Sequence, residues 1–137
     1  MEISVDIDAP PDMVWSVLAD VERWPEWTIS MISVTRIDDG PLTVGSKARV
    51  EQPKLRTAVW EVTDLDAPHS FTWVSRSPGI LTTAGHLLRP SAHDGTTVTL
   101  SAAMTGVLAP LLRRMLGTRV ERYVHAEAKG LKRRCEG

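Results

Sequence analysis

Between residues 31 and 105, short segments in which apolar and polar residues alternate are separated by clusters of turn-forming residues. This period of two is typical of half-buried β-strands. The turn clusters include Asp39-Gly40-Pro41, Pro78-Gly79 and Asp94-Gly95, and they leave no room for a helix between consecutive segments. Strands joined by such short connections pair antiparallel. The pattern therefore predicts a meander of six antiparallel strands, at residues 31–38, 45–52, 56–65, 70–76, 80–89 and 96–105.

Both ends of the chain add elements to this meander. Residues 2–8 alternate in the same way and predict a first strand. Apolar residues then recur at helical spacing from Pro11 to about Asp20, and a shorter helical stretch, interrupted by Pro25, covers Val21 to Trp27. Helical spacing returns from Leu108 to Leu131 and predicts one long amphipathic helix. The expected order is β-α-α-β-β-β-β-β-β-α, in a single α+β domain that spans residues 1–137.

The charges and the single cysteine exclude some classes of function. The 16 basic and 17 acidic residues nearly balance, so we expect no DNA partner. The distribution is uneven, because eight basic and three acidic residues from Val107 onward give a net charge of +5 and leave −6 before it. Cys135 is the only cysteine, which excludes an intrachain disulfide. Because Cys135 lies two positions before the last residue, we expect little structure around it and therefore a poor nucleophile.

We expect neither a signal peptide nor a membrane-spanning segment in this sequence. The first eight residues, MEISVDID, are acidic and alternating rather than basic and apolar, which argues against a signal peptide. No apolar run approaches the ~18–20 residues of a membrane span. A cytoplasmic protein without a membrane span is the expectation.

Several strings in the chain resemble a known superfamily. They are VDIDAPPDMVWSVLADVERWPEW, WEVTDLDAPHSFTWVSRSPG, the turn HDGTTVTL and the long basic terminal helix. Together they resemble the START-like (SRPBCC) superfamily, and within it the polyketide cyclase/dehydrase-like branch. The resemblance spans essentially the whole chain. It implies a helix-grip fold, in which a curved seven-stranded antiparallel sheet wraps around the C-terminal helix, with an apolar cavity between sheet and helix.

Strand parity selects the residues that would line such a cavity. Trp60 and Val62 share one strand face with Ala58 and Asp64, and small residues at positions 46, 48 and 84 leave space. A filled core is the alternative, and one β-bulge would invert the inward face. The expected ligand-binding residues are Trp60, Val62, Phe71, Trp73, Ala84, His86, Leu88, Met115, Arg119 and Tyr123.

Two polar residues, His86 and Tyr123, are candidates for proton transfer. His86 has small or apolar neighbours on its strand face, so it could act as a general acid or base, or be a satisfied structural histidine. Arg119, Tyr123 and Glu127 are spaced i, i+4, i+8 on one helical stripe, and Tyr123 is expected to face the sheet. The other histidines lack metal-ligand spacing, and no phosphate-binding loop or nucleophile elbow is present. We expect no metal and no cofactor.

The five tryptophans divide into two groups by position. Trp15, Trp24 and Trp27 lie in the N-terminal helical region and are expected to anchor it to the sheet. Trp60 and Trp73 lie on neighbouring strands and would form walls of the cavity.

Two functions remain open at this point. The first is binding of a small hydrophobic molecule between sheet and helix, with or without cyclase/dehydratase-like chemistry in which the cavity folds a reactive chain. The second is a non-enzymatic carrier, sensor or interaction module, monomeric or homodimeric, that binds a protein through the basic side of its terminal helix. A solvated helix face is the simpler alternative. The arginines of that side are Arg113, Arg114, Arg133 and Arg134.

Overall fold

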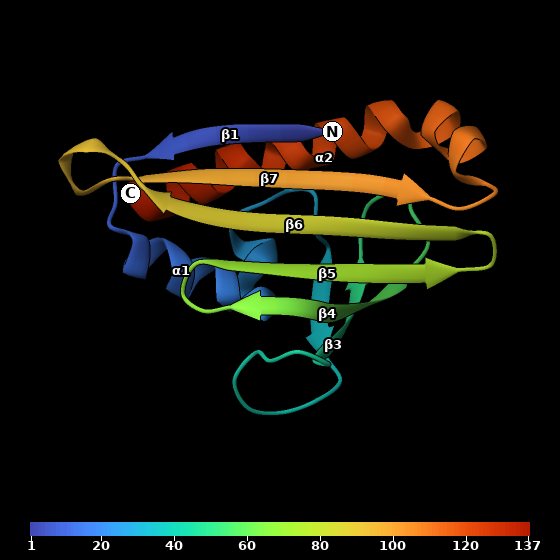
Figure 1. Cartoon of the computed structure of the whole chain (residues 1–137), viewed down its shortest axis with the longest axis horizontal. Helices are drawn as coiled ribbons and strands as arrows, with labels where there is room; N and C mark the ends of the chain where they lie inside the picture. Colours follow the sequence, from blue (N-terminus) through green and yellow to red (C-terminus); the bar gives the residue numbers. More distant parts are fainter.

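A computed structural model describes all 137 residues of the chain. Seven strands form one antiparallel sheet in the order β1-β7-β6-β5-β4-β3-β2, and a long helix lies against it (Figure 1). The strands are β1 (Glu2–Ile7), β2 (Ser33–Arg36), β3 (Lys47–Glu51), β4 (Ala58–Asp66), β5 (Ser70–Ser77), β6 (Ile80–Pro90) and β7 (Thr96–Thr105). The meander from β2 to β7 is therefore confirmed, and β1 extends the sheet by pairing with β7.

The helices also follow the predicted order. They are α1 (Pro11–Ala19), the 3-10 helices η1 (Val21–Glu26) and η2 (Ala92–Asp94), and α2 (Ala109–Glu136). Pro11 lies in the first turn of α1, where backbone N–H groups have no partner within the helix, so the missing N–H of proline costs no hydrogen bond. The seven strands and the long C-terminal helix form the expected helix-grip fold. Strand β2 is shorter than the predicted range 31–38, because residues 37–46 leave the sheet as a long loop.

Cross-strand pairing shows which residues lie on the face of the sheet that packs against α2. Val62 pairs with Trp73, Trp73 with Ala84, and Ala84 with Ala102, so these four residues share one face across four strands. Val62 and Trp73 are almost completely buried on it. The parity predicted for these strands is thus correct over most of their length.

A β-bulge changes that parity within β4. The register shifts between Val62 and Asp64, so that Asp64 pairs with Thr72, and Leu65 pairs with the buried Phe71. Asp64 is exposed and does not share the inner face with Val62, which corrects the predicted grouping. The extra residue of the bulge turns the following side chains over, and this keeps a carboxylate out of the core.

The N-terminal helices are fixed to the sheet by an aromatic cluster. Trp24 is 1% exposed, and its indole N–H donates a 2.9 Å hydrogen bond to the Leu18 carbonyl. Its ring centroid lies 5.6 Å from that of Trp27 and 5.3 Å from that of Trp73. The anchoring role predicted for Trp24 agrees with these contacts. Trp73 belongs to the same packed cluster and is 3% exposed.

The second half of α2 is packed closely against the rest of the molecule. Leu131 is fully buried, and a Cβ atom on Gly130 would lie 1.9 Å from the carbonyl oxygen of Trp27. Only glycine permits this approach of the helix to η1. At the end of α2, Glu136 accepts a 2.8 Å hydrogen bond from the backbone N–H of Asp8. In Figure 1 this half of α2 passes behind β1 and β7.

Candidate functional site

The first half of α2 stands away from the sheet and leaves a pocket of about 420 Å³. Its first turns, orange in Figure 1, lie at the end of the sheet opposite to the C-terminus. Ligand pockets in proteins typically measure roughly 300–1,000 Å³, so this space is large enough for a small molecule. The lining residues are Met1, Thr82 from β6, Ala102, Ala103 and Met104 from β7, and Arg113, Gly117, Val120 and Glu121 from α2.

The side chains of α2 explain why this space is open. With 3.6 residues per turn, Arg113, Gly117 and Val120 lie on the same side of the helix as the buried Leu131. Gly117 has no side chain to fill the gap, and no atom lies within 4 Å of the position that its Cβ would take. Arg113 donates a 2.7 Å hydrogen bond to the Met104 carbonyl at the pocket edge. A charged group and a glycine therefore occupy positions where a packed helix would place apolar side chains.

Deeper between sheet and helix, β6 and α2 bring a histidine and a carboxylate together. His86 Nε2 lies 3.4 Å from Glu127 Oε1, and the two side chains are 3% and 11% exposed. The oxygen Oε1 is buried and makes no hydrogen bond. On the other side of the ring, His86 Nδ1 lies 3.1 Å from the Phe71 carbonyl oxygen.

These contacts distinguish the two ring nitrogens of His86. A carbonyl oxygen only accepts, so His86 Nδ1 carries a hydrogen and donates it to Phe71. Nε2 is then the ring nitrogen that faces Glu127 Oε1. The pair places this nitrogen next to a buried carboxylate oxygen that has no other partner. Such a pair can give a proton to a bound molecule or take one from it.

Aromatic side chains fix the orientation of His86. The Phe71 ring stacks on the imidazole with centroids 4.2 Å apart and planes 13° from parallel. Trp24 and Trp73 approach it with centroid distances of 5.5 Å and 6.2 Å. The imidazole has little freedom to rotate, so its Nε2 stays directed at Glu127.

Small side chains separate this pair from the pocket. Thr82, Ala84 and His86 alternate along the inner face of β6, and Thr82 lines the pocket. Ala84 pairs with Ala102, which also lines it. Two residues of a strand span about 7 Å, so Ala84 is the one inward-facing residue of β6 between the pocket wall and the histidine. The pair is therefore four positions along β6 from the pocket wall at Thr82, a distance of about 13 Å along the strand.

A second pocket, of about 380 Å³, lies between α1 and the loop that joins β2 to β3. Its lining is mixed in character. It includes Trp15 and Leu42, but also Ser16, Asp20 and Arg36.

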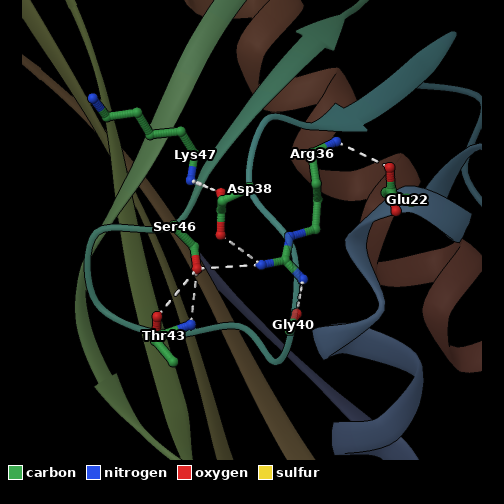
Figure 2. Close-up of polar contacts among 7 residues, drawn as sticks. All are labelled: Glu22, Arg36, Asp38, Gly40, Thr43, Ser46 and Lys47. Carbon is green, nitrogen blue, oxygen red and sulfur yellow. Dashed lines mark hydrogen bonds and ion pairs between the residues drawn. The ribbon is translucent and has the colours of Figure 1, made fainter.

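Figure 2 shows the polar network that holds this β2–β3 loop. Arg36 Nη2 donates to Asp38 Oδ2 at 2.8 Å and to Ser46 Oγ at 3.3 Å. The backbone N–H of Lys47 donates to Asp38 Oδ1 at 2.8 Å. That backbone hydrogen bond, with the Arg36 guanidinium beside it, holds the pKa of Asp38 below its ordinary value. Arg36, Asp38 and Ser46 bind one another and the loop backbone, so this network holds the β2–β3 loop in place.

The sequence matches one family model over residues 1–136, and the family is described as polyketide cyclase / dehydrase and lipid transport. The chain belongs to this family. No curated protein sequence matches the chain significantly.

Solved structures show the same fold as this member of the polyketide cyclase/dehydrase family. A hypothetical protein of Helicobacter pylori aligns with a TM-score of 0.83 at 14% identity, covering 98% of this chain and 86% of the other. A protein of Thermus thermophilus aligns with a TM-score of 0.79 at 18% identity, covering 98% and 95%. The Zhui aromatase/cyclase of a Streptomyces species aligns with a TM-score of 0.76 at 19% identity, covering 99% and 92%.

Most strand residues predicted to line a cavity in this family member are part of the packed core. Val62, Phe71, Trp73, His86 and Leu88 are each at most 4% exposed. Trp60 and Ala84 are partly buried and pack against the same core. None of these seven lines either of the two pockets described above.

The helical residues predicted with them are separated by the structure. Met115 is 67% exposed, on the side of α2 that faces away from the sheet, because it is nearly half a turn from Arg113 and Gly117. Tyr123 donates its hydroxyl to the Pro53 carbonyl, and Arg119 donates to the Lys54 carbonyl at 3.3 Å. Tyr123 and Arg119 therefore hold the loop between β3 and β4 against α2.

Sequence reasoning missed the pocket wall and the partner of His86. Glu127 was recognisable as a carboxylate on a helical stripe, but the stripe alone does not show that β6 lies opposite. Gly117 was visible as a glycine in the middle of a predicted helix, which is unfavourable without a packing or functional reason. That glycine was the available signal for a space between helix and sheet.

Proposed function

We propose that this chain binds a small apolar molecule of the polyketide or lipid class in the pocket between the first half of α2 and strands β6 and β7. The unfilled space next to Gly117 is the observation that supports this most directly. The description of the family and the aromatase/cyclase named among the similar structures favour the same class of molecule. Ala102, Met104 and Val120 give the pocket apolar walls, and Arg113 supplies a cation at its edge.

We further propose that the His86–Glu127 pair acts on the bound molecule as a general acid and base. A carbon between two carbonyl groups is acidic enough for a buried carboxylate or imidazole to remove its proton. The proton moves to the pair, the bonding electrons become an enolate, and the pair returns the proton to carbon or oxygen. Cyclisation and dehydration of a polyketide chain both begin with such a step.

Ligand binding is tested with the fluorescent probe 1-anilinonaphthalene-8-sulfonate. The substitution Gly117→Leu places a large side chain in the open space beside the helix and does not disfavour the helix. We expect probe binding to the native chain, and a loss of about tenfold or more in Gly117→Leu, because the probe and the leucine compete for one volume.

The matched control is Met115→Ser, which removes apolar surface from the opposite side of the same helix. It should leave the affinity for the probe unchanged. Equal affinity in the native chain and Gly117→Leu would reject the pocket as the binding site. A loss only in Met115→Ser would mean that the probe binds the exposed helix surface.

Proton transfer is tested by deuterium exchange into acetoacetyl-N-acetylcysteamine, followed by nuclear magnetic resonance. General acid–base groups typically accelerate proton transfer by about 10²–10⁴-fold. We expect His86→Asn and Glu127→Gln to reduce exchange to the uncatalysed rate. Tyr123→Phe is the control, since the Tyr123 hydroxyl already donates to Pro53. If the native chain binds the probe but does not accelerate deuterium exchange, the protein is a carrier and the catalytic part of the proposal is rejected.

A further inference from the structure

Four large apolar side chains are exposed at the beginning of α2 and immediately before it. Met115 is 67% exposed, Leu111 is 54% exposed and Leu108 is 42% exposed. Val107, just before the helix, is 87% exposed. The spacing of positions 108, 111 and 115 places them on one side of the helix, opposite to Gly117 and Val120 of the pocket. This is the reverse of a surface helix, which turns its apolar side to the core.

The same outer side carries several basic residues. Arg114, Arg122, Lys129 and Arg133 are exposed on it, and none of them forms an ion pair. Two of the three carboxylates of α2, Glu127 and Glu136, have partners in other parts of the molecule. Glu121 lines the pocket, Glu127 faces His86, and Glu136 binds Lys132 and the backbone of Asp8. We call this side, defined by Val107, Leu108, Leu111, Arg114, Met115, Arg122, Lys129 and Arg133, the outer face of α2.

Charge and apolar exposure together identify what the outer face fits. A helix with protruding apolar side chains and flanking basic residues binds in the interface of a bilayer, with its apolar groups among the acyl chains. Each basic residue near a membrane surface gains free energy from anionic headgroups. A symmetric dimer through this face would bring two sets of unpaired arginines and lysines together, which like-charge repulsion opposes.

The position of the apolar end adds a second argument. The exposed apolar residues begin at Val107, next to the pocket edge formed by Met104 and Arg113. The basic residues extend from there along the rest of the helix. The apolar groups are therefore concentrated at one end of the helix, where they can enter a headgroup region while the basic residues lie along the surface.

We propose that the outer face of α2 docks on a lipid bilayer that contains anionic lipids. The helix lies along the surface, its first turns enter the headgroup region, and the arginines and lysines contact phosphate groups. No helix of the chain is long and apolar enough to cross a membrane, and docking of this kind needs none. The proposal goes beyond ligand binding, because the docking itself requires no occupied pocket.

The test is co-sedimentation of the full chain with vesicles. One set consists of phosphatidylcholine alone, and the other contains about 30% phosphatidylglycerol as the anionic lipid. We expect the native chain to sediment with the anionic set only, and less so as salt is added. Leu111→Ser with Met115→Ser should weaken binding about tenfold or more, and Arg114→Glu with Arg122→Glu should do the same.

Matched controls lie elsewhere on the surface. Ile29 is 88% exposed after η1, so Ile29→Ser removes similar apolar area without touching α2. Arg56→Glu reverses an exposed charge in the loop between β3 and β4. Both variants should bind like the native chain. Helix content measured by circular dichroism shows whether the α2 variants remain folded.

Three results would overturn the proposal. The native chain could stay in solution with anionic vesicles, or the Leu111→Ser, Met115→Ser variant could bind as tightly as the native chain. A dimer seen by light scattering in lipid-free buffer, and dissolved by the same two substitutions, would assign the outer face to self-association. Binding of the naphthalene probe to the pocket is measured without lipid, so failure of docking and failure of ligand binding are distinguishable.

Discussion

The two halves of α2 belong to one helix beside one sheet, yet they pack in opposite ways. In the second half, residues 123–136, Leu131 is fully buried and Gly130 contacts the Trp27 carbonyl directly. In the first half, residues 109–122, Leu111 is 54% exposed and Gly117 borders open space. Leu131 faces the sheet, whereas Leu111 and Met115 of the first half face away from it. The second half of α2 therefore stabilises the fold, whereas the first half leaves apolar surface and open space for binding.

The largest expected difference concerns the two leucines. Leu131→Ala leaves a cavity in a packed region and should cost roughly 2–5 kcal/mol in the free energy of unfolding. Leu111→Ala shortens an exposed side chain and should change it by about 0.5 kcal/mol or less. Urea denaturation of both variants measures the two values. Similar costs would mean that the first half of α2 is packed as tightly as the second.

The two glycines give the next largest contrast. A Cβ at position 130 would overlap the Trp27 carbonyl, so Gly130→Ala should destabilise the chain by about 1–3 kcal/mol. At position 117 nothing lies within 4 Å, so Gly117→Ala should stabilise it by about 0.5–1 kcal/mol through helix propensity. Thermal unfolding of the two variants would show shifts of opposite sign. Destabilisation by both would contradict the open space beside Gly117.

The reactivity of the Cys135 thiol reports how tightly the second half of α2 is packed. Burial, with the nearby Glu136 charge, raises the pKa of the Cys135 thiol from 9.0 to about 11. The thiol is therefore protonated at neutral pH, and iodoacetamide should modify the native chain far more slowly than the urea-unfolded chain. Because the folded pKa is raised, the stability associated with this group is present below pH 9 and is lost as pH rises toward 11. Equal rates for folded and unfolded chains would show an open last turn.

The smallest effect is expected at the end of the same half. The hydrogen bond from the backbone of Asp8, followed by that from Lys132, lowers the pKa of Glu136 below its ordinary value. A lowered folded pKa stabilises the folded state above the ordinary pKa, and this contribution is lost as the pH falls below it. The amide resonance of Asp8 should follow this titration. A midpoint at or above the value of a free glutamate would mean that the contact is absent.

The sequence predicted the strands and helices because local patterns determine them. Alternation, turn residues and short connections specified a meander, and Pro11 marked the start of α1. The expectation for Cys135 was correct for a different reason. Its thiol is unreactive because the last turns of α2 bury it, whereas the sequence suggested that little structure would surround it.

The candidate site was harder to predict because it depends on parity and on facing partners. One bulge after Val62 turned Asp64 outward, and no local pattern marks such a bulge. His86 was found from its apolar strand neighbours, but its partner Glu127 is 41 positions away in the numbering and meets it only when α2 crosses the sheet. Met115 showed the right spacing for a helical stripe, which by itself does not say which side of the helix the sheet covers.

The order of elements, the antiparallel pairing and the inner face of most strands were predictable from local sequence patterns, because they follow from steric and hydrophobic rules acting over a few neighbouring residues. Tertiary packing alone fixes which half of α2 is buried against the sheet, where Gly117 leaves a pocket, and that His86 lies 3.4 Å from Glu127. These features depend on the rotation and distance of one helix relative to seven strands, and every side chain in the interface contributes to them at once.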